Sequence, residues 1–166
     1  MKYIGIDCGL DGGICELDSA GNITKMIVMP TVKTGKGRKI NLHELSELFK
    51  IFRGNGSCRF SIENPGGHAP SAAGLRSMTY SFAVVEAFLV CNLLTYQEFS
   101  ARKWQSEFWS RPTMPKGKKF DTKSAALSEA KKLWPGCTFV KSDRSKKAHD
   151  GLVDAALIAE FGRRKF

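Results

Sequence analysis

An acidic residue interrupts the first apolar stretch of this chain. Residues 2–17 read KYIGIDCGLDGGICEL, a pattern that predicts two antiparallel strands joined by a glycine-rich turn, with Asp7 at the end of the first strand. A carboxylate in the middle of a sheet is destabilising unless a cation or hydrogen-bond donors meet it. Three interpretations are open: Asp7 or Asp11 caps a turn, Asp7 binds a metal ion for phosphodiester hydrolysis, or the turn binds the phosphates of a nucleotide.

The length and the charge of the chain narrow these alternatives. A chain of 166 residues, 42% of them hydrophobic, predicts one domain over residues 1–166. The 26 Lys and Arg against 16 Asp and Glu, a net charge of +10, favour a polyanionic partner such as nucleic acid. No run approaches the ~20 apolar residues of a membrane span. We find no signal or transit pattern, so we expect a cytoplasmic protein of a prokaryote or of a phage-infected cell, with no membrane partner.

The apolar periodicity predicts an α/β fold. Further strands are expected at residues 22–29, 58–63 and 93–99, and helices at 41–52, 77–91 and 148–161, with two more starting after Ser100 and Asp121. Residues 31–39 are expected to form a mobile basic loop. This order predicts a ribonuclease-H-like, five-stranded mixed sheet, its first three strands an antiparallel meander, with helices on both faces. Residues 77–91 have little polar surface, so we expect that helix to be buried centrally or at a subunit interface.

Three more carboxylates occur where a lone charge is unexpected. Glu63 ends a predicted strand and opens onto a loop rich in Gly and Pro, the usual place for a catalytic group in an α/β sheet. Asp150 and Asp154 are four residues apart and share one helix face. Asp150 also suits a first helical turn, whereas Asp154 is surrounded by apolar residues. Oxygen ligands of this kind suit Mg²⁺ or Mn²⁺.

Positive charge is concentrated in the predicted loops and is expected to bind the DNA backbone. The candidates are Lys33, Lys36, Arg38, Lys39, Arg111, Lys116, Lys118, Lys119, Lys146 and Lys147. Four of these lysines, at 118, 119, 146 and 147, are also candidates to neutralise the phosphate in the transition state. Trp104, Phe108 and Trp109 are candidates for base stacking, although their spacing is more typical of a core. His149 is more typical of a helix surface than of a general base.

The motifs, taken in order, resemble one enzyme family. GIDCGLDGG around Asp7, SIEN around Glu63 and HDGLVDAALIAEFG around Asp150 and Asp154 resemble the RuvC-like Holliday-junction resolvases of the ribonuclease-H-like superfamily, and are most similar to the phage and plastid branch. The run Arg102-Lys103-Trp104-Gln105 is similar to that family's "P-x-x-W-K" region. The resemblance implies that the four carboxylates hold two Mg²⁺ ions per active site, with Mn²⁺ able to substitute. It also implies a homodimer that cuts four-way DNA junctions by paired symmetric nicks.

Other functions stay open at this point. A kinase-like ATPase needs two related lobes and a second phosphate loop, which 166 residues do not supply, so no nucleotide cofactor is expected. A ribonuclease H, a broader nuclease for flaps and branched DNA, and a non-catalytic junction-binding protein remain. The helix at residues 77–91, whose one charged residue is Glu86, favours a dimer over a monomeric ribonuclease H. Four carboxylates favour an enzyme over a binding protein.

Overall fold

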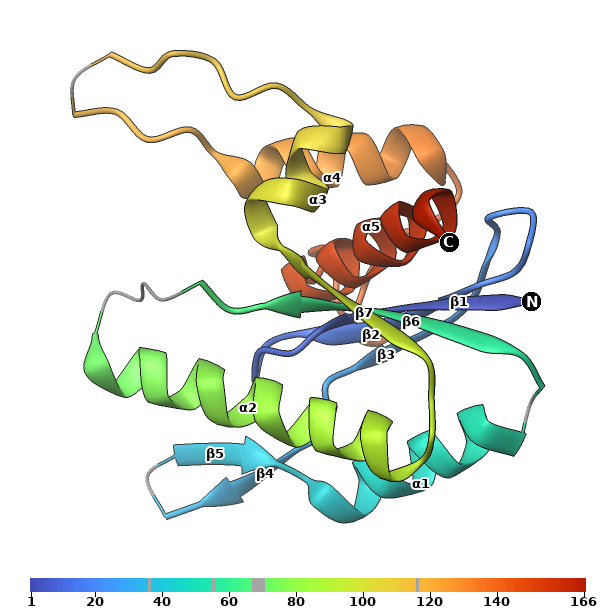
Figure 1. Ribbon diagram of the computed structural model, residues 1–166. Helices are drawn as coiled ribbons and strands as arrows, with labels where there is room; N and C mark the ends of the chain where they lie inside the picture. The colour runs from blue at the N-terminus through green and yellow to red at the C-terminus, as the bar shows by residue number, and fades with distance from the viewer. Residues whose placement is uncertain (36, 55, 67–70, 116) are drawn as a thin grey trace.

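A five-stranded mixed sheet forms the centre of the molecule, in the order β3-β2-β1-β6-β7 (Figure 1). The structure is a computed structural model that describes residues 1–35, 37–54, 56–66, 71–115 and 117–166. Strands β1 (Lys2–Asp7), β2 (Gly13–Leu17) and β3 (Ile23–Val28) form an antiparallel meander. Strands β6 (Cys58–Asn64) and β7 (Tyr96–Ser100) extend the sheet in parallel with β1. The predicted sheet is therefore confirmed.

Helices cover both faces of this sheet (Figure 1). One face carries α1 (Leu42–Gly54) and α2 (Ala72–Cys91), and the other carries α3 (Ala101–Phe108), α4 (Thr122–Leu133) and α5 (Asp150–Lys165). Each face has its own cluster of buried apolar side chains. The predicted helix caps form: Asn41 and Glu44 bond reciprocally before α1, and Asp121 accepts hydrogen bonds from the first amides of α4.

Helix α5 meets β1 and the turn after it backbone to backbone at two glycines. A Cβ atom at Gly5 of β1 would lie 2.1 Å from the carbonyl oxygen of Ala155. A Cβ atom at Gly151 would lie 2.2 Å from the carbonyl oxygen of Asp11 and 2.5 Å from the Cα of Gly12. Glycine is needed at these positions because backbone meets backbone. The turn after β1 thus makes room for the start of α5, a role that the sequence did not predict.

The prediction of a mobile basic loop at residues 31–39 is wrong. This segment forms a two-stranded hairpin of β4 (Thr31–Thr34) and β5 (Gly37–Ile40), with Lys33 opposite Arg38. Two features fix the hairpin: Ile40 is completely buried, and the amide of Asn41 donates to the carbonyl of Pro30 at 2.9 Å. The hairpin is basic as expected, but it is an ordered part of the fold.

Helix α2 begins earlier and is less buried than the sequence predicted. It begins at Ala72, after Ser71 accepts a hydrogen bond from the amide of Gly74 at 3.1 Å. One face packs on the core, while Tyr80 and Val90 are 43% and 55% exposed. By length and composition alone α2 would also pass as a membrane-spanning helix, a criterion that core helices of soluble proteins meet as well. The helix therefore has one buried face and an exposed face that also carries large apolar side chains.

Candidate active site

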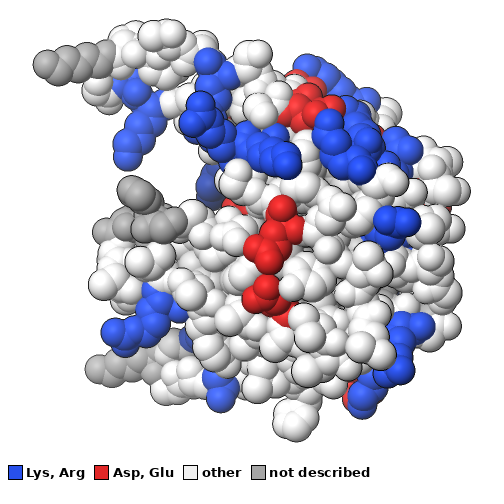
Figure 2. Space-filling view, in the orientation of Figure 1, with Lys and Arg blue, Asp and Glu red and all other residues white. Residues whose placement is uncertain are grey.

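Two of the predicted site residues end neighbouring parallel strands. Ile6 of β1 pairs in register with Ile62 of β6, so Asp7 and Glu63 follow at the same edge of the sheet. Helix α5 crosses β1 and brings Asp154, on its second turn, to the same region. Figure 2 shows acidic side chains in the middle of one face of the molecule, with Lys and Arg side chains above and below them. The fold thus brings together Asp7 and Asp154, which are 147 positions apart in the sequence.

Three of the carboxylates form one electrostatic cluster. Burial and the charge of Asp7 raise the pKa of Glu63 from 4.5 to about 7. Burial and the charges of Asp7, Glu63 and Asp150 raise the pKa of Asp154 from 3.8 to about 8. The pKa of Asp7 is also raised, mainly by burial. Three ionised carboxylates in one buried cluster repel one another, so the cluster favours either bound protons or a bound cation.

Asp150 lies at the rim of this cluster. Its side chain is 46% exposed and its carboxylate pairs with Nζ of Lys123 at 2.5 Å. Lys123 stands in the first turn of α4, and its charge also reaches Asp154, whose pKa it lowers. Lys123 is not among the four lysines that the sequence analysis proposed to neutralise a phosphate. Its contact with Asp150 depends on how α4 packs against α5.

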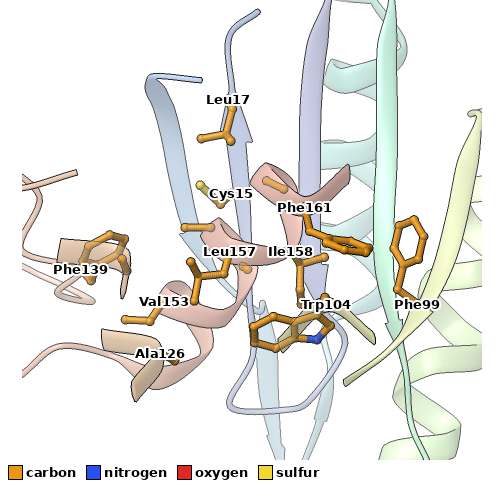
Figure 3. Close-up of a cluster of buried hydrophobic side chains, with 14 residues drawn as sticks. Cys15, Leu17, Phe99, Trp104, Ala126, Phe139, Val153, Leu157, Ile158 and Phe161 are labelled. Carbon is orange, nitrogen blue, oxygen red and sulfur yellow. The ribbon is translucent and has the colours of Figure 1, made fainter. Parts of the chain in front are cut away.

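A buried tryptophan holds one oxygen of Glu63. The indole Nε1 of Trp104 donates a hydrogen bond to Oε2 of Glu63 at 2.6 Å, while the amide of Gly9 donates to Oδ1 of Asp7 at 3.0 Å. Trp104 is completely buried within the cluster that α5 builds with Leu157 and its neighbours (Figure 3). The sequence interpretation that favoured a core position for Trp104 over base stacking is confirmed, but its bond to Glu63 was not predicted.

His149 is not the exposed surface residue that the sequence favoured. It is the residue before α5, is partly buried, and makes no side-chain cap to the helix. Its charge lowers the pKa of Asp7, so its ring lies near that carboxylate. Its Nδ1 atom is buried and has no hydrogen-bond partner within the described residues. His149 therefore borders the carboxylate cluster and has an unpaired polar atom there.

The donor set fits a divalent cation in chemistry and in charge. Carboxylate oxygens are the ligands that Mg²⁺ and Mn²⁺ prefer, and a cation would relieve the repulsion among Asp7, Glu63 and Asp154. Asp7 and Glu63 also line a small pocket together with Cys8, Pro65 and other neighbours. Across the described ranges, no three His, Cys, Asp or Glu side chains are already gathered as ligands around one point. The carboxylates are near one another without forming a closed cage.

Comparison with known proteins gives a match in structure alone. A scan against protein-family models found no match, and a search of curated proteins found none. The chain is similar to the solved structure of T. thermophilus RuvC in complex with a Holliday junction substrate, with a TM-score of 0.62 and 11% identity over 99% of this chain and 96% of that chain. The structure of Thermus thermophilus RuvC matches with a TM-score of 0.57, 12% identity and the same coverage. The fold is that of RuvC.

The basic residues proposed to bind DNA occupy three places on this RuvC-like fold. Lys33, Arg38 and Lys39 lie on the β4–β5 hairpin, and Arg38 pairs with Asp11 at 2.7 Å, which ties the hairpin to the turn after β1. Lys146 and Lys147 line a pocket that reaches His149. Arg111, Lys118 and Lys119 are exposed in the segment between α3 and α4. The candidates Lys36 and Lys116 lie outside the described residues.

Proposed function

We propose that this protein is a structure-selective endodeoxyribonuclease that resolves four-way DNA junctions by paired symmetric nicks. The observation that carries the proposal is the cluster of Asp7, Glu63 and Asp154 at one edge of a RuvC-like sheet. The net charge of +10 supports a nucleic-acid substrate. One of the similar structures is a RuvC in complex with a Holliday junction substrate, which supports branched DNA as that substrate.

The chemistry that we propose is metal-assisted hydrolysis of a phosphodiester. When bound, two Mg²⁺ ions supply a nucleophilic water near neutral pH and stabilise the leaving oxygen, and Mn²⁺ is expected to substitute. Asp7, Glu63, Asp154 and Asp150 would hold these ions. Lys123, at 2.5 Å from Asp150, is positioned to neutralise a phosphate that approaches the rim of the site. Trp104 keeps Glu63 in place by its hydrogen bond.

We further propose that the protein acts as a homodimer in the cytoplasm. Two active sites related by a two-fold axis suit the two symmetric strands of a junction. Helix α2 supports this proposal, since it exposes Tyr80, Ala83, Ala87 and Val90 along one stripe at helical spacing. Exposed apolar surface of this kind is typical of a protein interface.

A substrate panel tests the proposed function. The protein is incubated in Mg²⁺ with a synthetic four-way junction, a duplex, a flap and an RNA–DNA hybrid, and we expect symmetric nicks in the junction. Preferred cleavage of the hybrid would instead support a ribonuclease H. Binding of the junction without any cleavage would support a junction-binding protein.

The variant Asp7→Asn identifies the site within this panel. We expect it to abolish nicking, to bind the junction as tightly as the wild type or more tightly, and to fold normally, because the substitution removes one charge from a repelling cluster. Gel shift, nicking and thermal unfolding measure the three quantities. Nicking by Asp7→Asn at the wild-type rate would rule out this carboxylate cluster as the active site.

A further inference from the structure

A second group of hydrogen-bond donors lies beside α3, apart from the carboxylate cluster. Arg102 and Ser106 of α3, with Trp109, Ser110 and Arg111 after it, line an open pocket of about 310 Å³. Pockets that hold small ligands start at about 300 Å³, so this pocket has room for one nucleotide unit. We call these five residues the α3 pocket.

The α3 pocket carries positive charge that no carboxylate of the described residues neutralises. Among the described residues, neither Arg102 nor Arg111 forms an ion pair, and Arg111 donates only to the side-chain oxygen of Gln105. The acidic residue of α3, Glu107, is instead paired with Arg164 and Lys165 of α5. Two unpaired guanidinium groups on one pocket are suited to the oxygens of a phosphate group, which arginine binds with two parallel hydrogen bonds.

Trp109 connects the α3 pocket to the carboxylate cluster. Its ring meets the ring of Trp104 edge-on, with 5.8 Å between centroids and an interplanar angle of 89°. Trp104 in turn donates to Glu63 at 2.6 Å, so a single indole ring lies between Trp109 and Glu63. The indole Nε1 of Trp109 is buried and has no acceptor in the described part of the chain. The pocket is therefore separated from Glu63 by one indole ring, and both of its charged side chains are hydrogen-bond donors.

We propose that the α3 pocket is a phosphodiester-binding subsite for the DNA strand that is cut, where Arg102 and Arg111 hold a phosphate neighbouring the scissile one. This inference deepens the proposed nuclease function and rests on it for the identity of the strand. The shared ligand chemistry is a phosphate group, which a DNA strand, a mononucleotide or inorganic phosphate can present. The position of the pocket beside Glu63 favours the DNA strand.

A charge-matched pair of double variants tests the subsite. In Arg102→Gln/Arg111→Gln both guanidinium groups of the pocket are lost, whereas Lys25→Gln/Arg53→Gln removes two exposed charges from β3 and the end of α1. We expect the pocket variant to bind junction DNA at least 10-fold more weakly than the control variant, and to lower the slope of log K against log salt by about one relative to that control. Equal affinities and slopes for the two variants would overturn the inference even if both still nick the junction.

A second measurement does not depend on nuclease activity. A short single-stranded oligonucleotide, deoxynucleoside monophosphate and inorganic phosphate are each titrated while the indole N–H signal of Trp109 is followed by NMR, with Trp109→Phe used to assign the signal. We expect the oligonucleotide to shift this signal at far lower concentration than either small ligand, and the pocket variant to abolish the shift. If the shift occurs in a protein that nicks no junction, the proposed function fails and the subsite stands. An equal response to inorganic phosphate and to the oligonucleotide, or none to any probe, would overturn a subsite for a DNA strand.

Discussion

The indole Nε1 of Trp104 lies 2.6 Å from Oε2 of Glu63 and donates a hydrogen bond to it. Burial and the charge of Asp7 raise the pKa of Glu63, and this bond opposes the rise, because a donor stabilises the ionised carboxylate. Trp104 has no exposed surface, so its ring cannot turn away without disturbing the core around it. The hydrogen bond therefore fixes the orientation of the Glu63 carboxylate and favours its ionised form, which is the form that binds a cation.

Replacing the indole donor tests this role. We predict that Trp104→Phe lowers Mg²⁺-dependent junction nicking by about 10–100-fold, the usual effect of removing a group that orients a metal ligand. The Mg²⁺ concentration for half-maximal nicking should rise as well, which a purely structural loss would not cause. A titration of nicking rate against Mg²⁺ measures both quantities.

Trp134→Phe is the matched control for that variant. This variant also loses one indole hydrogen bond, which Trp134 donates to the carbonyl of Gly21 at 2.8 Å. Trp134 packs against Phe139 rather than near the carboxylates. We expect this variant to keep the wild-type Mg²⁺ requirement. If both variants shift the Mg²⁺ requirement equally, the bond to Glu63 has no specific role.

The raised pKa values of Glu63 and Asp154 predict a dependence of stability on pH. Their pKa values are about 7 and about 8 in the folded protein, against ordinary values of 4.5 and 3.8. As pH rises through this interval the unfolded chain releases protons that the folded chain keeps, so the free energy of unfolding falls. The contribution of both groups is fully present below about pH 4 and is lost as pH passes about 8.

The variant Asp154→Asn should reduce this dependence. Without divalent ions, we predict that the melting temperature of the wild type falls more steeply than that of Asp154→Asn between about pH 5 and about pH 8.5. Excess Mg²⁺ should flatten the wild-type curve, because a bound cation takes the place of the protons. Parallel curves for the two proteins in metal-free buffer would mean that Asp154 does not titrate within the cluster.

Lys123 is predicted to matter for catalysis and little for stability. Its ion pair with Asp150 is exposed, because 73% of the Lys123 side chain and 46% of the Asp150 side chain are accessible to solvent. Such pairs contribute less than about 1 kcal/mol to the free energy of unfolding. We predict that Lys123→Gln lowers junction nicking at least about 10-fold, because a charge beside the reacting phosphate is lost. Lys132→Gln removes a similar pair on the same helix, that with Glu129 at 2.6 Å, and should leave nicking unchanged. Wild-type nicking by Lys123→Gln would exclude a role for this lysine.

The exposed face of α2 predicts the oligomeric state. Tyr80 and Val90 should be buried in the proposed dimer, so Tyr80→Glu/Val90→Glu should be a monomer with an intact fold, since both side chains already face solvent in a single chain. Analytical ultracentrifugation measures the mass, and thermal unfolding checks the fold. A wild-type protein that is monomeric at all concentrations would contradict the proposed dimer.

Local patterns were sufficient to predict the sheet and the carboxylates at its edge. Asp7, Glu63 and Asp154 stand out in sequence because each lies where an apolar strand or helix makes a lone charge destabilising. The contacts that surround them were not predictable in the same way. Trp104 reaches Glu63 across 41 positions and Lys123 reaches Asp150 across 27, and neither contact leaves a periodic signal. Asp150 was predicted as the fourth metal ligand or as an acidic residue of the first helical turn, and the packing of α4 places it in an exposed ion pair with Lys123.

The hairpin of β4 and β5 shows a second limit. Its residues alternate poorly and carry many charges, which is typical of a loop. What orders them is the burial of Ile40 and the backbone bond between Asn41 and Pro30, both of which depend on the rest of the fold. Tertiary contacts thus override a weak local preference.

The backbone contact of α5 with β1 at Gly5 has a consequence for how the protein is made. The site needs Asp7 from the first strand and Asp154 from the last helix, and that helix can settle only where glycine leaves room for it. A growing chain on the ribosome therefore contains at most half of the four carboxylates until α5 has been made, and before then it cannot assemble the site. A nuclease built in this way would stay inert towards the DNA of its cell until its last helix has emerged and docked.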